Sequence, residues 1–171
     1  MKYRNLDDKC YGVTGMALSM VVLNAEDMFT HITIEEEGLK GIGFIEDFYY
    51  SGNPSVSAKS TWNIVVEHYK IAIAVVLANV MCRKMVRERV ELDAKTRNKL
   101  LKALIAEGES QCQLEEDEIT TLFNKTYNYL GQLFANYQVR GLLTQFAKEL
   151  KTRKKMSQRE VMDIFQALQM M

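Results

Sequence analysis

The residues best suited to chemistry in this chain are His31 and the carboxylates near it. His31 and Glu35 are four positions apart and Asp27 lies one turn earlier, so a helix over 27–35 would place all three on one face. Imidazole and carboxylate groups arranged in this way can ligate a metal ion. In a strand, His31 and Glu35 still share a face, but Asp27 lies too far along it. A metal-binding or enzymatic protein that uses His31 and Glu35 is our third functional hypothesis, because structural histidines explain both His31 and His68 more simply.

Other patterns for catalysis or cofactor binding are missing from the sequence. There is no Gly-x-Ser-x-Gly elbow, and neither histidine follows a glutamate by three positions, as a ferritin-like site requires. The stretch 38–43 reads GLKGIG, which departs from the dinucleotide-binding and P-loop patterns and predicts a turn. We therefore assign no catalytic, cofactor-binding or metal-ligating residues and expect a protein that is not an enzyme.

Two basic clusters are the candidates for nucleic-acid binding. The first spans 83–89 and contains Arg83, Lys84, Arg87 and Arg89; the second spans 148–155 and contains Lys148, Lys151, Arg153, Lys154 and Lys155. Cations grouped beside a helix can bind phosphates. However, the helix expected after the second cluster carries one base, Arg159, and two acids, and the whole chain has 22 bases against 22 acids. A small nucleic-acid-associated regulator is therefore our second hypothesis.

The cysteines predict a reducing compartment. Cys10, Cys82 and Cys112 are odd in number, far apart in sequence and form no Cys-x-x-Cys pair, so we interpret them as free thiols and expect a cytoplasmic protein.

The uncharged run 10–23 follows three bases and resembles the start of a secretory signal, so residues 1–25 acting as an export signal is the alternative. Asp7 and Asp8 just before the run and the large Leu23 near its end argue against a signal. We therefore predict a buried first helix over 6–27.

Length and composition predict one domain over 1–171. The chain has 171 residues, of which 47% are hydrophobic and 26% charged, as is typical of a globular protein. The only proline is Pro54, which favours long uninterrupted helices after it. The uncharged run from Ile71 to Cys82 has 12 residues, against about 20 needed to cross a bilayer, so we expect no membrane span.

The predicted fold is all-α, an irregular bundle of four to five helices around a buried central helix over 58–91. Residues 28–50 form either a small β-hairpin, with Phe44 to Tyr50 as its second strand, or a helix followed by an irregular loop. A short helix over 94–107 is closed by Gly108. A longer one over 115–151 should bend near Gly141, since unbroken it would be about 55 Å long. Ser157 and Glu160 form a capping box that opens the last helix.

The pattern that points to function is a seam of apolar residues with heptad spacing: Phe123, Tyr127, Leu130, Phe134 and Tyr137. The formal charge also alternates, at −5, +5, −3 and +3 over residues 1–56, 57–107, 108–147 and 148–171, as adjacent helices or a head-to-tail dimer would show. Ten methionines supply adaptable apolar surface. Our first hypothesis is therefore a soluble helical protein that acts through protein contacts, with a second copy of itself as a homodimer or with another protein.

Overall fold

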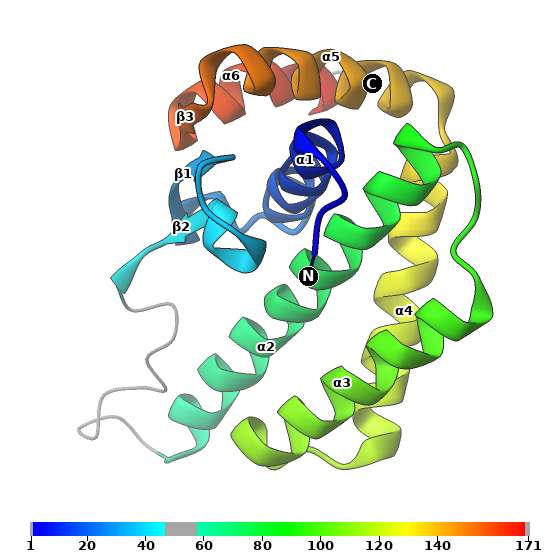
Figure 1. Ribbon diagram of the computed structural model, residues 1–171. Coiled ribbons are helices and arrows are strands. Elements are labelled where there is room, and N and C mark those ends of the chain that lie inside the picture. Colours follow the sequence, from blue (N-terminus) through cyan, green and yellow to red (C-terminus); the bar gives the residue numbers. More distant parts are fainter. Residues whose placement is uncertain (1, 47–57, 170–171) are drawn as a thin grey trace.

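Helices make up most of the protein, as the sequence predicts. The computed structural model describes residues 2–46 and 58–169, and in this part of the chain the six α-helices are α1 (Leu6–Val22), α2 (Ala58–Met81), α3 (Ala94–Cys112), α4 (Glu116–Ala135), α5 (Tyr137–Arg153) and α6 (Gln158–Gln169). In Figure 1, α5 and α6 cross one end of the molecule, α3 lies at the other end, α2 runs diagonally, and α4 runs along one side from α3 to α5.

The central helix α2 packs against α1, α3 and α4. At the crossing of α1 with α2, a Cβ on Gly15 would overlap the carbonyl oxygen of Ala78, so only glycine allows this approach. α1 is enclosed for most of its length, from Asp8 to Val21, with Tyr11 half-buried. The predicted buried first helix is therefore confirmed, although it ends at Val22 and a short 3₁₀ turn, Glu26–Met28, follows.

A three-stranded antiparallel sheet covers one side of α1 and confirms the hairpin alternative for 28–50. Its order is β2 (Ile42–Phe44), β1 (Phe29–Thr33), β3 (Lys155–Ser157). Ile32 pairs with Ile42 on one side and with Met156 on the other. The second strand spans Ile42–Phe44, so it shares only Phe44 with the predicted run from Phe44 to Tyr50. Residues 45–46 are not part of the strand, and 47–50 lie outside the described residues. The sequence did not predict β3, because three residues are too few to show the alternation of apolar and polar side chains that marks a strand.

The predicted central helix 58–91 is interrupted. Regular α-helix ends at Met81 and a π-helical segment, Cys82–Arg87, follows, with the Glu88 N–H donating to the Arg83 carbonyl at 3.2 Å. The chain then leaves the helix at Arg89, whose φ is +61°. A wider turn of this kind rotates the side chains after it, and such segments are frequent at functional sites.

Two further predicted helix boundaries were wrong. α3 continues past Gly108 to Cys112, because Gly108 is a contact glycine: a Cβ there would meet the Tyr69 ring of α2. The bend in the predicted helix 115–151 lies at Asn136 instead of Gly141. Asn136 has an extended backbone, and its side chain accepts from the N–H groups of Gln138 and Val139, which makes it the N-cap of α5.

One helix in the described part of the chain is long and apolar enough to cross a membrane. It spans Asn63–Arg87, and its most apolar window has a mean hydropathy of 1.7. The expectation from the 12-residue uncharged run did not count the flanking residues that lengthen it. Half of the window is buried inside the protein, and the core helix of a soluble protein meets the same criterion.

Candidate functional site

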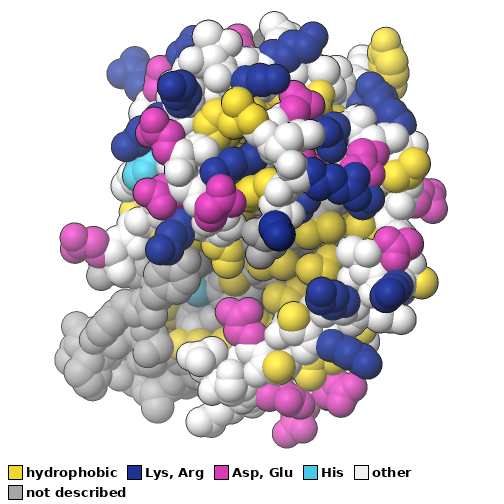
Figure 2. All heavy atoms as spheres, viewed as in Figure 1, with side chains coloured by type: hydrophobic (Ala, Val, Ile, Leu, Met, Phe, Trp, Pro, Cys, Tyr) yellow, Lys and Arg dark blue, Asp and Glu magenta, His cyan; other side chains and the backbone are white. Residues whose placement is uncertain are grey.

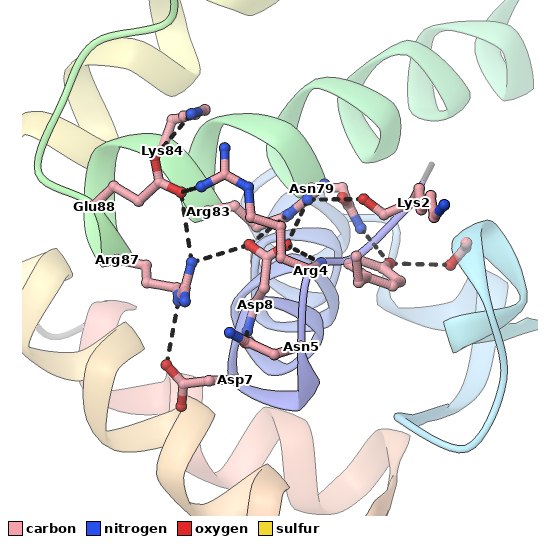
Figure 3. Close-up of polar contacts among 12 residues, drawn as sticks. Lys2, Arg4, Asn5, Asp7, Asp8, Asn79, Arg83, Lys84, Arg87 and Glu88 are labelled. Carbon is pink, nitrogen blue, oxygen red and sulfur yellow. Dashed lines mark hydrogen bonds and ion pairs between the residues drawn. The ribbon is translucent and has the colours of Figure 1, made fainter.

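A buried carboxylate, Asp8, organises the charged groups at the start of α1. Its side chain is 1% exposed and receives two hydrogen bonds from the Arg83 guanidinium, from Nε at 2.9 Å and from Nη2 at 2.6 Å. The backbone N–H of Arg4 donates to the same carboxylate at 2.9 Å, and Arg87 approaches at 3.3 Å (Figure 3). Burial alone would raise the pKa of Asp8, but the hydrogen bonds from Arg83 and Arg4 outweigh it and hold this pKa below its ordinary value.

The remaining charges of the first basic cluster are paired around Asp8. Arg87 contacts Asp7 at 3.3 Å, and Glu88 accepts from Lys84 and from Arg4, both at 2.8 Å. These contacts with Lys84, Arg4 and Arg87 lower the pKa of Glu88. Of the four cations in 83–89, three are therefore engaged within the protein, and Arg89 is exposed.

The same cluster fixes the N-terminal segment on the molecule. The Asn79 amide donates to the Tyr3 hydroxyl at 2.8 Å, and the Arg83 guanidinium lies 5.0 Å from the centre of the Tyr3 ring. Arg83 also donates to the Lys2 carbonyl at 3.0 Å. The π-helical segment aims Arg83 and Arg87 at α1, so the first basic cluster is an internal clamp.

The second basic cluster lies on the surface. All five cations of 148–155 are exposed, along with Arg159. Lys151 contacts Asp7 at 3.4 Å, and Arg153 contacts Glu149 and Glu160. Within the described residues, Lys148, Lys154 and Lys155 form no salt bridge. Glu160 also accepts from the Ser157 N–H at 2.8 Å, which confirms the predicted capping box of α6.

The structure does not bring the predicted metal ligands together as a helical triad. His31 lies in β1, Asp27 lies in the 3₁₀ turn before it and Glu35 follows the strand, so the helix over 27–35 is absent. His31 instead packs on Gly43, where a Cβ would overlap its ring, and its Nδ1 lies 2.9 Å from the Thr30 hydroxyl. Burial and the neighbouring Lys155 lower its pKa. In the described part of the chain, no three His, Cys, Asp or Glu side chains converge as a metal site.

The heptad seam belongs mainly to the core of this chain. Phe123, Leu130 and Phe134 are fully buried, and Tyr127 is half-buried. Tyr137, in contrast, is 84% exposed because the break at Asn136 rotates it away from the seam. Phe134 and Tyr137, which the heptad spacing places on one face, therefore have different environments.

Three surface pockets formed by described residues offer no catalytic set. The pocket between α2, the π-helical segment and α4 has a volume of about 440 Å³ and is lined by Met81, Met85, Tyr127, Gly131 and four others. The other two have volumes of about 370 and 560 Å³. None of the three is lined by a histidine or a cysteine. The three cysteines are buried, and burial raises the pKa of the Cys10 thiol to about 11.

One apolar stripe of α2 is only partly covered by the rest of the described chain. The stripe begins at Tyr69, which is buried and whose hydroxyl donates to the Leu104 carbonyl of α3 at 2.6 Å. Ala72, Val76 and Val80 continue the same stripe at helical spacing but are only half-buried. Figure 2 shows hydrophobic side chains gathered over a hollow between α2 and α3. We call this surface, Ala72, Val76 and Val80 together with the half-buried Leu101 and Ile105 of α3, the α2–α3 face.

Sequence reasoning did not single out Asp8 or the α2–α3 face. The available signal for Asp8 was a carboxylate in the first turn of a helix that is uncharged from Cys10 onward; a carboxylate buried with such a helix requires a cationic partner. The face had no such signal, because α2 is apolar on all sides and its sequence does not show which side remains uncovered.

Comparison of the chain with protein-family models, with curated proteins and with solved structures found no match.

Proposed function

We propose that this protein is a helical interaction protein, not a catalyst, and that it acts as a homodimer through its α2–α3 face. The observation that supports this proposal is the incomplete cover of its most apolar helix. Residues that are as apolar as Val76 and Val80 lose hydrophobic stabilisation while they remain partly in water, and a bound chain would recover it. Met85 and Met162, which are both half-buried, supply deformable side chains at the surface.

The first experiment measures the mass of the full chain in solution by light scattering coupled to size exclusion. We expect twice the monomer mass of 19.7 kDa. A mass near 19.7 kDa at all protein concentrations up to about 100 μM would contradict the homodimer.

The second experiment tests the surface. Val76→Glu should convert the dimer to a folded monomer, whereas Val76→Thr, which keeps the shape, should weaken it less. Leu23→Glu is the matched control, because Leu23 is 37% exposed at the end of α1, outside the α2–α3 face. Circular dichroism of each variant confirms that the chain still folds. Equal mass for Val76→Glu and Leu23→Glu would place the contact elsewhere.

A second candidate function, nucleic-acid binding, is favoured by one observation. The cations of 148–155 are exposed next to Arg159, while three of the four cations in the first cluster are engaged internally. A phosphate-binding surface would therefore consist of 148–155 without 83–89. Salt-dependent retention on heparin tests this candidate.

A further inference from the structure

We propose that the second copy binds antiparallel along α3, with the two-fold axis between Ile105 and Ala106, so that Lys102 of each copy pairs with Glu109 of the other. This inference rests on the proposed function, since it specifies the geometry of the dimer. In this arrangement each copy's α3 covers the open α2 face of the other.

The first support is the separation of charge along α3. Its first half, 94–103, carries four cations and no acid, and three of them, Lys95, Lys99 and Lys102, are exposed. Its second half carries only acids, Glu107 and Glu109, and the four acids 115–118 follow at the start of α4. Figure 2 shows Lys and Arg side chains over α3 and acidic side chains at the lower edge of the molecule. A helix with one cationic end and one acidic end is complementary to itself when reversed.

The second support is that Lys95, Lys102 and Glu109 form no salt bridge with any other described residue, whereas the cations near Asp8 are paired. Within the described part of the protein, these three charges are therefore available to an intermolecular partner.

The third support is the register. Lys95, Lys102 and Glu109 are seven residues apart, so they lie on one face of α3 after successive double turns. An antiparallel pairing that brings Lys102 opposite Glu109 centres the axis between Ile105 and Ala106.

The residues at the axis are suited to close contact. Ile105 is half-buried and Ala106 is exposed, so the centre of the contact is apolar, and the small side chain of Ala106 allows the two helices to approach closely. Charged pairs then flank an apolar centre, as in coiled coils, where flanking charges set the orientation of the partner. A two-fold contact is isologous, so each pairing occurs twice and each substitution acts twice.

A charge-reversal cycle tests the register in the full chain. K102E and E109K each place like charges opposite one another at two positions, and each should weaken the dimer by about tenfold or more in Kd. The double variant K102E/E109K restores opposite charges at both positions, so its Kd should return to within about threefold of the original. K125E, an equal change at an exposed lysine of α4, is the matched control and should leave Kd unchanged.

Analytical ultracentrifugation over a dilution series measures these constants. If the unaltered chain is monomeric, both the proposed homodimer and this register are overturned. If it is dimeric but K102E and E109K resemble K125E, or if the double variant is not rescued, the register is overturned while the dimer stands.

Cross-linking gives an independent readout that does not depend on charge. Ala106→Cys should form an intermolecular disulfide under mild oxidation, because a bridge needs Cα atoms within about 7 Å and only positions near the axis meet that limit. Glu107→Cys, also exposed but on the side of α3 opposite Lys102 and Glu109, should not. The three native cysteines are buried and should not compete. Equal cross-linking of both variants, or none with Ala106→Cys in a dimeric sample, would overturn the proposed axis.

Discussion

The two basic segments of this chain, 83–89 and 148–155, have similar composition and opposite roles in the structure. In the first, Arg83 and Arg87 converge on the buried Asp8, and Lys84 pairs with Glu88. In the second, all five cations are exposed. The difference comes from what α1 presents to each segment, a buried carboxylate in one case and only the half-exposed Asp7 in the other. Whether a run of cations is paired inside the protein or exposed to solvent therefore depends on the elements that pack against it, not on its own composition.

The largest effect is expected from removing the Asp8 carboxylate, on which the cations of the first segment converge. Asp8→Asn should lower the free energy of unfolding by about 3–5 kcal/mol, because the Arg83 guanidinium would remain in a mostly buried position without its counter-charge. Urea denaturation measures this change. Asp7→Asn is the control: Asp7 is 48% exposed, so its loss should cost at most about 1 kcal/mol. Equal losses in the two variants would remove the distinction between the segments.

Low pH should weaken the ionic contacts that the first segment makes with Asp8 and leave those of the second segment nearly unaffected. Because the folded pKa of Asp8 lies below its unfolded value of 3.8, its contribution is complete above that value and is lost as pH falls through the folded pKa. Stability measured by urea titration should therefore fall more steeply below pH 4 in the unaltered chain than in Asp8→Asn. Parallel profiles for the two proteins would show that Asp8 does not carry this dependence.

Neutralising the second segment should change binding more than stability. Lys148→Gln/Lys154→Gln/Lys155→Gln should alter the free energy of unfolding by no more than about 0.5 kcal/mol, since these side chains are exposed. If the segment binds phosphates, this triple variant elutes from heparin at lower salt than the chain with three other exposed lysines, Lys40, Lys99 and Lys125, changed to Gln. Equal elution of the two triple variants would exclude 148–155 as a specific anion-binding surface.

The smallest effect links the second segment to the sheet. The pKa of His31 is lowered by burial first and by Lys155 second, so Lys155→Gln should raise this pKa while leaving it below 6.5. The depressed pKa means that neutral His31 stabilises the fold fully above pH 6.5 and that this contribution is lost as pH falls through the folded pKa. NMR titration of the His31 ring protons measures the shift. An unchanged titration curve would show that Lys155 does not act on His31.

Sequence patterns predicted the helices well where the determinants were local. The capping box of Ser157 and Glu160, the acids at 115–118 and the apolar centre of α2 each act within one or two turns of their own helix. Helix ends were predicted less well, since Gly108 and Gly141 were interpreted by residue type. Gly108 is required by its contact with Tyr69, while a Cβ on Gly141 would meet nothing within 4 Å and no bend occurs there. Asn136 was the better local signal for the bend, as asparagine is a preferred N-cap.

The candidate surface could not be predicted in the same way. The sequence shows that α2 is apolar on every side, but exposure of Val76 depends on how far α3 diverges from α2, which no local pattern encodes. The charge pattern of α3 was visible in the sequence, but only the folded chain shows that Lys95, Lys102 and Glu109 form no salt bridge with other described residues.

By itself, the sequence determined that this protein is helical, that α2 forms its centre and that residues 28–50 carry the only ambiguous β-pattern. The tertiary structure decided which cations are neutralised, where the third strand pairs and which side of α2 is left open. The physical reason is distance along the chain: Asp8 and Arg83 are 75 residues apart, and a contact of that separation depends on the packing of whole helices, not on the spacing of neighbours.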